Sequence, residues 1–306
     1  MTFMAINPAT GEAIATYAET SSGQVARIIE RAHQAHLGWR GEPGAERAAR
    51  LTALGALLRE RAHDYGQLMT VEMGKPLAQA VAEAEKCGWV CDYYAENAER
   101  FLAPVPAPTD ATTSYWVHRP LGVVLGIMPW NFPFWQVVRF AAPAITAGNA
   151  ILLKHAPCVP GCAEALETLF ADAGYPAGLF ANLFIDVEAT GEVIDHELVR
   201  AVSLTGSVRA GRAVASRAGA AIKKCVLELG GSDPSLVLAD ADLDAAVASC
   251  AMGRLLNAGQ SCVAAKRFVV VDAVYDKFRD AFVEAMKNVK MGDPSKNEGD
   301  IGPMAR

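Results

Sequence analysis

Cys262 is the residue of this 306-residue chain whose surroundings most clearly favour chemistry. It follows residues 256–261, a helix-like stretch that contains Gly259 and small polar neighbours. Backbone amides at such a place can lower the pKa of a thiol, and the resulting thiolate is a nucleophile. The alternative is a buried thiol that serves only for packing. We therefore take Cys262 as a candidate nucleophile.

Asn131 is a candidate partner for this nucleophile. It lies between Pro129 and Pro133, and the flanking prolines restrict the backbone and hold the asparagine in a fixed place. A rigidly held amide NH2 can donate a hydrogen bond to an oxyanion that develops during a reaction. The alternative is an ordinary turn that the asparagine caps.

Glu228 is a candidate general base. The carboxylate is followed by Gly230 and Gly231, which let the backbone turn tightly and let another segment or a ligand approach closely. A carboxylate in such a place could activate water. The alternative is a glutamate that merely ends a strand.

Two segments have features that suit a phosphate-bearing ligand. The apolar run 150–154 ends in Lys154, which could reach a ribose or a phosphate or could extend into solvent. Gly206 and Ser207 lie in a turn from strand to helix, where free backbone N–H groups suit a pyrophosphate. The turn lacks the full GxGxxG pattern, so it is a weak dinucleotide signal by itself.

The predicted elements explain how these residues could meet. Residues 6–17 predict a hairpin, the rest of the first third is helical, and from residue 122 short β-branched runs alternate with helical segments. Such alternation indicates βαβ units around a parallel sheet, where ligands bind beyond the carboxyl ends of the strands. The predicted helices are 22–39, 46–65, 77–101, 134–146, 161–173, one after Ser207, 243–256 and 273–289, and the predicted strands are 113–118, 123–127, 150–154, 181–185, 202–204, 221–229 and 267–271.

Composition narrows the class of protein. The chain is 52% hydrophobic and 20% charged with a formal net charge of −6, which offers no electrostatic footprint for nucleic acid or an anionic membrane. No apolar run approaches the roughly 20 residues that a membrane helix needs. The odd number of cysteines, seven, and the absence of a secretory pattern at the start favour the reducing cytoplasm. We expect a cytoplasmic protein of two domains, with neither nucleic acid nor membrane as a partner.

The remaining cysteines favour a structural interpretation. Cys87 and Cys91, and Cys158 and Cys162, are spaced four apart, but neither pair has a further histidine or cysteine nearby in the sequence. We therefore expect no metal site.

Taken together, the motifs resemble the aldehyde dehydrogenase superfamily along the whole chain. The resemblance rests on residues 129–133 (PWNFP), 204–207 (LTGS), 228–231 (ELGG) and 257–262 (NAGQSC), which occur in the order of the family. The longer segments 153–157, 206–211 and 228–234 are similar to those of bacterial NAD(P)-dependent succinate-semialdehyde dehydrogenases. The resemblance implies an α/β fold with a Rossmann-type parallel sheet domain.

For the reaction, the resemblance implies a thiohemiacetal formed by Cys262 on an aldehyde. Asn131 and the backbone N–H of Cys262 would hold the oxyanion, and one such donor is typically worth about 10²–10³ in rate. Hydride transfer to NAD or NADP would leave a thioester, which water activated by Glu228 would hydrolyse.

For the cofactor, the resemblance implies that Lys154 contacts the adenosine ribose and that Gly206 and Ser207 lie against the pyrophosphate. Trp130 and Leu229 complete the expected cofactor residues.

The sequence departs from the commoner family pattern at Pro157, where many members have a glutamate that disfavours a 2′-phosphate. Loss of that carboxylate leaves the choice between NAD and NADP open.

Arg139 is the candidate substrate residue. In a helix that begins near Pro133, residues Phe132, Gln136 and Arg139 share one face close to Asn131. A guanidinium there could bind the distal carboxylate of a short semialdehyde in a bidentate manner, as the resemblance to the succinate-semialdehyde subgroup implies. The alternative is an arginine at the surface or at an interface.

The resemblance also divides the chain. It implies an NAD(P)-binding domain over 1–229, with an oligomerisation strand at about 111–121, and the first part of a catalytic domain over 230–306. Family members continue further, through a Glu-x-Phe-Gly-Pro segment that does not occur here, so we expect an incomplete catalytic domain.

Two classes of function therefore stay open. One is an aldehyde dehydrogenase for succinate semialdehyde or another aldehyde, of which this chain is a truncated or partly recorded form and which would be a homo-oligomer at full length. The other is a truncated, non-catalytic remnant that binds nucleotide.

Overall fold

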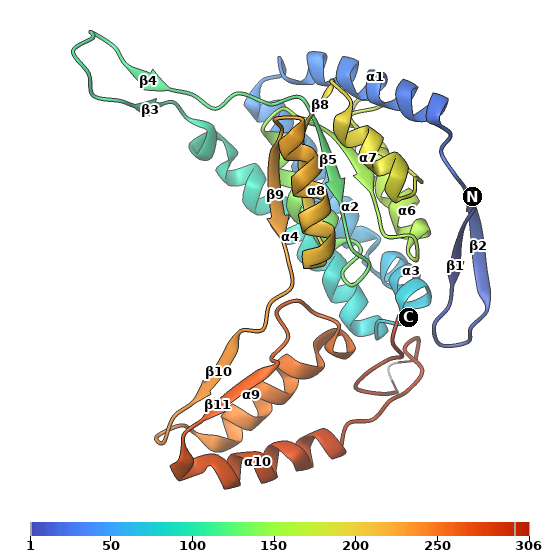
Figure 1. The fold of residues 1–306 in the computed structure, drawn as a ribbon, viewed down its shortest axis with the longest axis vertical. Coiled ribbons are helices and arrows are strands. Elements are labelled where there is room, and N and C mark those ends of the chain that lie inside the picture. The colour runs from blue at the N-terminus through green and yellow to red at the C-terminus, as the bar shows by residue number, and fades with distance from the viewer. Residues whose placement is uncertain (1, 297, 306) are drawn as a thin grey trace.

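The computed structural model describes residues 2–296 and 298–305, and Figure 1 shows their arrangement. Met1, Asn297 and Arg306 belong to the expected domain ranges but lie outside the described residues. In the part of the chain that is described, one five-stranded sheet forms the centre and a smaller unit lies beside it (Figure 1). The predicted α/β class with a parallel sheet is confirmed.

The chain begins with the predicted hairpin, made of the antiparallel strands β1 (Thr2–Ile6) and β2 (Ala13–Ala18). Four helices follow: α1 (Ser22–Trp39), α2 (Gly44–Glu60), α3 (Ala62–Met73) and α4 (Leu77–Leu102). The single helix predicted over 46–65 is wrong, because Arg61, with a ψ of 16°, separates α2 from α3. Helix-forming residues continue across that break, so the sequence pattern does not reveal it.

After α4, the chain forms a two-stranded hairpin. Its strands are β3 (Val105–Pro106) and β4 (Tyr115–Trp116), and it extends away from the rest of the molecule (Figure 1). Both residues of β4 are exposed, at 58% for Tyr115 and 50% for Trp116. The oligomerisation strand expected at about 111–121 includes β4, and its role stays a prediction.

The central sheet has all its strands parallel, in the order β7-β6-β5-β8-β9. The chain starts in the middle at β5, moves outward through β6 and β7, and then returns to the other side for β8 and β9. The order therefore reverses between β5 and β8, which is where ligands bind in sheets of this kind. The strands are β5 (Val123–Ile127), β6 (Ala150–Lys154), β7 (Phe180–Asn182), β8 (Val199–Thr205) and β9 (Lys224–Glu228).

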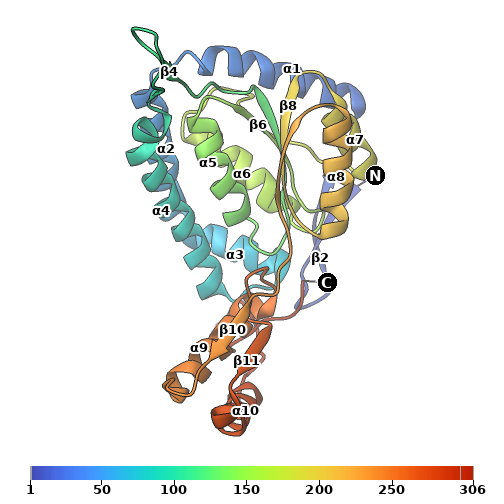
Figure 2. The ribbon, with the colours of Figure 1, turned by 60° about the vertical axis from the view of Figure 1, so that its left-hand side comes forward.

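Helices cover both faces of this sheet. Figure 2 shows α5 and α6 on one side and α7 and α8 on the other. All residues of β6 are buried, which accounts for its continuous apolar sequence, because a strand covered on both faces needs no polar alternation. The covering helices are α5 (Trp135–Thr146), α6 (Pro160–Asp172), α7 (Val187–Asp195) and α8 (Val208–Ala220).

A smaller unit follows β9. Strands β10 (Pro234–Val237) and β11 (Arg267–Val270) pair in parallel, and α9 (Leu243–Leu255), a 3-10 turn (Leu256–Gly259) and α10 (Asp272–Lys287) complete it. Its core is built around Val237, Val247, Cys250 and Phe278, separate from the main core. The domain boundary expected between residues 229 and 230 stays a prediction.

To cross a bilayer, a helix needs both a length of about 20 residues and a predominantly apolar sequence. Within residues 2–296 and 298–305, no helix meets both requirements.

Candidate active site

A cleft of about 460 Å³ opens at the carboxyl ends of β5, β6 and β8. Segments from five distant parts of the chain meet there, including the turn that carries Cys262. This is the edge and the reversal point at which a parallel sheet binds ligands. The predicted site residues that line the cleft are Trp130, Asn131, Lys154, Gly206, Ser207, Leu229 and Cys262.

Cys262 lies in a turn just after the 3-10 segment, and its side chain is partly exposed. The backbone leading to it is unusual, because Asn257 and Ala258 have positive φ angles of 56° and 53°. Such angles cost non-glycine residues of the order of 1 kcal/mol each, and they persist only where the surroundings impose them. The Lys266 ammonium donates to the Cys262 carbonyl at 2.8 Å and to the Gly231 carbonyl at 2.7 Å, which ties this turn to the end of the central sheet.

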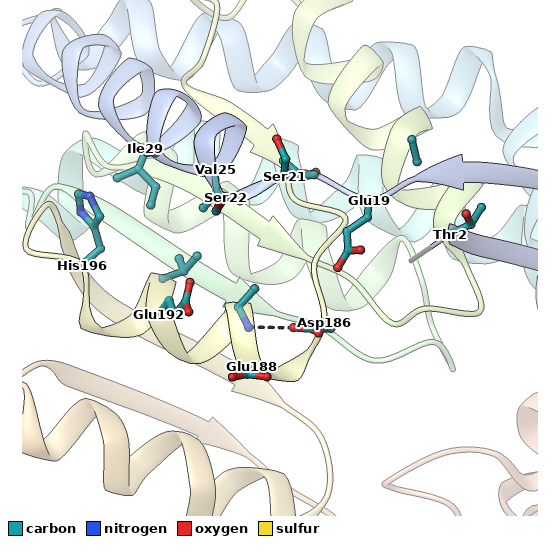
Figure 3. Close-up of a pocket in the computed structure, with 15 residues that line it drawn as sticks. Thr2, Glu19, Ser21, Ser22, Val25, Ile29, Asp186, Glu188, Glu192 and His196 are labelled. Atoms are coloured by element: carbon teal, nitrogen blue, oxygen red, sulfur yellow. Dashed lines mark hydrogen bonds between the residues drawn. The ribbon is translucent and has the colours of Figure 1, made fainter.

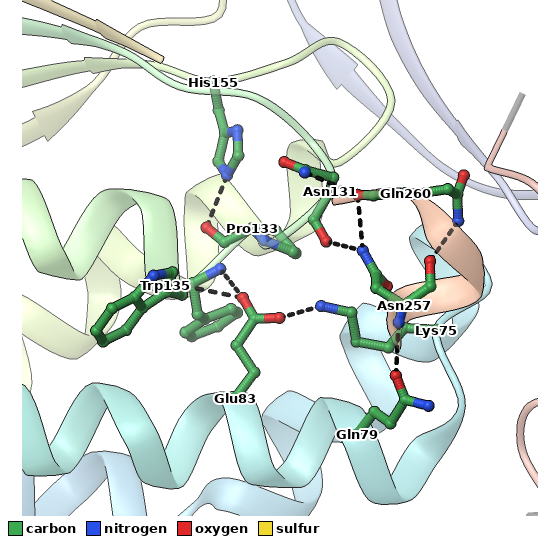
Figure 4. A network of polar contacts seen from close by, with 10 residues as sticks. Lys75, Gln79, Glu83, Asn131, Pro133, Trp135, His155, Asn257 and Gln260 are labelled. Carbon is green, nitrogen blue, oxygen red and sulfur yellow. Dashed lines mark hydrogen bonds and ion pairs between the residues drawn. The ribbon is translucent and has the colours of Figure 1, made fainter. Parts of the chain in front are cut away.

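Asn131 joins its own turn to the turn of the cysteine (Figure 4). Its Nδ2 donates to the Gln260 carbonyl at 2.8 Å, and the Asn257 Nδ2 donates to the Asn131 carbonyl at 2.6 Å. An amide NH2 has two hydrogens, so one remains for an oxyanion after the bond to Gln260. These two hydrogen bonds therefore hold together two loops that are far apart in the sequence.

Lys154 ends β6 and is 9% exposed. Burial lowers the pKa of its ammonium, and the Asp186 carboxylate opposes this shift. Asp186 itself caps α7 by accepting from the Ala189 N–H at 2.8 Å. The lysine therefore provides a positive charge inside the cleft rather than in solvent.

The turn at Gly206 and Ser207 begins α8. The Gly206 N–H donates to the Glu228 carbonyl at 2.9 Å, and the Ser207 hydroxyl accepts from the Ala210 N–H at 3.2 Å. The N–H groups of the first turn of a helix have no partner within the helix, so those of Val208 and Arg209 are the donors that α8 offers. The first turn carries no acidic residue, so the helix dipole there favours an anion.

Glu228 and Arg139 lie together, but in a neighbouring cleft of about 480 Å³. The Arg139 Nη2 is 3.6 Å from the Glu228 Oε2 and donates to the Thr205 hydroxyl at 3.3 Å. Thr205 lines both clefts, so the two clefts are adjacent. The structure thus brings the predicted base and the predicted substrate arginine together, in a cleft next to the one that contains the predicted nucleophile.

Thr205, Gln260 and Gln136 were not among the predicted site residues. Gln136 and Gln260 line the cleft with Cys262, and the Gln136 side chain is buried. Thr205 directly precedes Gly206 at the end of a strand, and this position is the sequence signal that could have identified it as a site residue. Nothing in the local sequence indicates that the Gln260 carbonyl would meet Asn131.

A larger cleft of about 750 Å³ lies between α1 and α7 (Figure 3). Its lining includes the carboxylates of Glu19, Asp186, Glu188 and Glu192. Because this lining is acidic, it would repel the phosphates of a dinucleotide. Size alone therefore does not identify the functional cleft here.

Comparisons with known proteins show the family of this chain. The model of the aldehyde dehydrogenase family matches residues 1–306. The chain is 46% identical over 305 residues to a probable succinate-semialdehyde dehydrogenase (NADP(+)) of Synechocystis, covering 100% of this chain and 67% of the relative. It is 45% identical to a succinate semialdehyde dehydrogenase (NAD(P)+) of Escherichia coli, covering 99% and 66%.

Among solved structures, succinic semialdehyde dehydrogenase of Streptococcus pyogenes, in complex with NADP+, is similar with a TM-score of 0.97 and 38% identity. This match covers 99% of the chain and 67% of that structure. The chain therefore spans about two thirds of the length of the relatives that it matches.

Proposed function

Because this chain belongs to the aldehyde dehydrogenase family, we propose that it oxidises succinate semialdehyde, or a similar short aldehyde, to the carboxylic acid with NAD+ or NADP+. The observation that carries the proposal is the meeting of Cys262 and Asn131 in one cleft. That cleft lies where the strand order of the sheet reverses, between β5 and β8.

The reaction begins at the Cys262 sulfur. Its thiolate attacks the aldehyde carbonyl and forms a C–S bond, while the carbonyl oxygen becomes an oxyanion that Asn131 stabilises with its amide N–H. The oxidant for this carbon would be a nicotinamide dinucleotide held in the same cleft, which would supply the hydride acceptor when bound. The acyl group then remains on Cys262 as a thioester.

Glu228 completes the cycle as the general base. Its carboxylate takes a proton from water, the water oxygen attacks the thioester, and the carboxylic acid leaves while the Cys262 thiolate is regenerated. In the structure, Glu228 is 57% exposed and pairs with Arg139. The side chain must therefore turn away from Arg139 and toward the cleft of Cys262 to reach the thioester.

The residues of the cleft fit a dinucleotide. The first-turn amides of α8 and the Lys154 ammonium are donors and positive charges suited to a pyrophosphate and a ribose. Pro157 lines the same cleft in place of an acidic residue, so no carboxylate at that position repels a 2′-phosphate. We propose that both NAD+ and NADP+ bind, with Trp130 and Leu229 forming apolar walls of the cleft.

Replacement of the nucleophile tests the proposed reaction. The chain is mixed with succinate semialdehyde and each nicotinamide dinucleotide, and absorbance of the reduced dinucleotide is followed. We expect steady turnover that Cys262→Ala abolishes, because no other group in the cleft can form the thioester. Cys225→Ala is the control, since Cys225 does not line this cleft. A thiol at Cys262 that is readily alkylated in a chain without hydride transfer would support the non-catalytic alternative.

Arg139→Ala tests the substrate. A bidentate ion pair with the distal carboxylate is worth about 1.5–3 kcal/mol, so we expect KM for succinate semialdehyde to rise about 10- to 100-fold. KM for an uncharged aldehyde of similar length should change little. The variant also frees Glu228 from its ion pair, but this affects the two substrates alike, so the ratio of their kcat/KM values isolates the carboxylate contact. Equal losses for both aldehydes would contradict the assignment.

The location and assembly of the protein stay proposals. We propose a cytoplasmic homo-oligomer in which the segment at about 111–121, with exposed Tyr115 and Trp116, lies between subunits. Light scattering would measure the molar mass in solution of the original chain and of a Trp116→Glu variant. The proposal predicts a lower mass for the variant, and equal masses would contradict it.

A further inference from the structure

The helix that follows Asn131 has no cap of its own. The residue before α5 is Phe134, and no side chain of its own segment accepts from the first N–H groups of the helix. These donors would be costly to bury without a partner. Instead, the Glu83 Oε1 accepts from the Phe134 N–H at 3.0 Å and from the Trp135 N–H at 2.9 Å (Figure 4). Glu83 belongs to α4, so the cap comes from a different element.

The other oxygen of this carboxylate pairs with Lys75. The Lys75 ammonium contacts the Glu83 Oε2, and the two side chains are 0% and 3% exposed. The same ammonium lies 4.0 Å from the centre of the Phe132 ring, a cation–π contact. The pair therefore contacts Phe132, Phe134 and Trp135, which lie within four residues of Asn131.

Gln79 lies between Lys75 and Glu83 in the sequence and contacts the loop that leads to Cys262. Lys75, Gln79 and Glu83 are spaced four apart, which places them on one side of α4 and the turn before it. The Gln79 Oε1 accepts from the Asn257 N–H at 2.9 Å, and Asn257 in turn donates to the Asn131 carbonyl. One row of side chains thus contacts both the loop of Asn131 and the loop that leads to Cys262 (Figure 4).

We propose that the buried pair of Glu83 and Lys75 positions the amide of Asn131 against Cys262, so that Glu83 acts on the rate of aldehyde oxidation through Asn131. This rests on the function proposed above. A buried ion pair often contributes little net stability compared with apolar residues of similar size. A carboxylate that accepts two N–H groups at the start of α5, just after the loop of Asn131, has instead a geometric role. Misplacement by about 1 Å far from the reacting atoms can cost about 10² in rate.

Glu72 supplies a matched control. It is also a buried glutamate, 2% exposed, and it also caps a helix from another element. Its two oxygens accept from the Gly161 N–H at 2.8 Å and the Cys162 N–H at 2.9 Å, at the start of α6. None of the residues that line the cleft of Cys262 belongs to α6. Loss of this cap should affect stability but not the reaction.

The decisive variants keep the site neutral, since removal of one partner would leave a buried charge. Lys75→Met/Glu83→Gln retains an amide oxygen that can accept from Phe134 and Trp135, whereas Lys75→Met/Glu83→Ala does not. We expect the alanine form to lose about 10- to 100-fold in kcat with KM for the aldehyde nearly unchanged, and the glutamine form to restore most of it. Glu72→Ala should leave kcat unchanged.

A double-mutant comparison shows whether the effect passes through Asn131. In an Asn131→Ala background, the alanine form of the pair should cost less than about twofold in kcat, because the donor that it positions is gone. A full 10- to 100-fold loss in that background would overturn the proposal. So would equal kcat values for the glutamine and alanine forms.

A measurement without turnover separates this proposal from the proposed function. Hydrogen exchange at the Phe134 and Trp135 amides, followed by mass spectrometry, should be faster in the alanine form and near the original rate in the glutamine form. Glu72→Ala should speed exchange only at the start of α6. If the unaltered chain oxidises no aldehyde, the proposed function is contradicted. Hydrogen exchange still tests whether Glu83 holds the N–H groups of Phe134 and Trp135. Unchanged hydrogen exchange over residues 131–136 in the alanine form would overturn the proposed positioning role of Glu83, even if the enzyme is active.

Discussion

His155 is a buried histidine whose protonation state is fixed by its neighbours. The Ala156 N–H can only donate, so the Nδ1 that it contacts at 2.8 Å must accept, and the Nε2 therefore donates to the Pro133 carbonyl at 2.9 Å. The ring is thus neutral, and burial lowers the pKa of His155 to about 4. The histidine holds the loop of Asn131 from the side opposite α4 (Figure 4).

This histidine should make stability depend on pH. Between about pH 6.5, its ordinary pKa, and pH 4, the unfolded chain binds a proton at His155 that the folded chain does not. The free energy of unfolding should therefore fall as pH decreases through this window, by up to about 1.4 kcal/mol per pH unit. Urea denaturation of the original chain and of His155→Gln should show that the difference between their slopes lies in this window. Parallel pH profiles would contradict the neutral, buried state.

The sequence suggests candidate residues with reactive groups more readily than the residues that position them. Cys262 and Asn131 could be found because their types and neighbours have chemical meaning by themselves. Glu83 and Lys75 could not, because they act through contacts 51 or more positions away, and neither stands out from the other polar residues of a helix.

At the level of elements, close packing between β5 and α5 leaves no room at Gly126. A Cβ added there would lie 2.6 Å from the Phe140 Cε1, so the ring would have to move. We expect Gly126→Ala to destabilise the chain by about 1–3 kcal/mol, measured by urea denaturation. Gly219→Ala is the contrasting variant, because nothing lies within 4 Å of its added Cβ in α8. It should be neutral or stabilise by up to about 1 kcal/mol, and a similar loss for both would contradict this packing argument.

Periodicity predicted the elements that are long or wholly apolar. β5 and β6 were found within their observed bounds, since a buried parallel strand has a continuous apolar sequence. α7 and β10 were not predicted. α7 has only nine residues and contains Gly191, a poor helix former, so the segment is too short and too weak in helix propensity to be recognised from its sequence. The strand predicted over 221–229 begins later, at Lys224, because Ile222 turns with a φ of 54°.

At the scale of the whole molecule, the two cores differ greatly in size. The main core continues from the helices α1–α4 through the central sheet, whereas the smaller unit relies on Val237, Val247, Cys250 and Phe278. Free energy of local opening follows the amount of buried apolar contact. We expect amide hydrogen exchange in α9, α10 and β11 to be faster than in β5 and β6, by at least about tenfold. Phe278→Ala should widen the gap, and uniform protection across both units would contradict it.

The overall class could be predicted, but the arrangement of side chains around the clefts could not. Alternation of strands and helices indicates a parallel sheet and the edge where a ligand binds. It does not determine which of the two neighbouring clefts a side chain lines. Arg139 and Glu228 were expected beside Cys262, yet they line the neighbouring cleft, because this depends on how β8, β9 and α5 pack.

The row of Lys75, Gln79 and Glu83 also bears on how the site is completed during synthesis. Its contacts to Phe134 and Trp135 span 51 and 52 positions, whereas its contact to Asn257 spans 178. At translation rates of about 5–20 residues per second, the second partner leaves the ribosome on the order of 10 s after the first. In the nascent chain, the loop of Asn131 can therefore pack against α4 before Cys262 has been synthesised. α4 would then serve as a template onto which the turn of the nucleophile docks last.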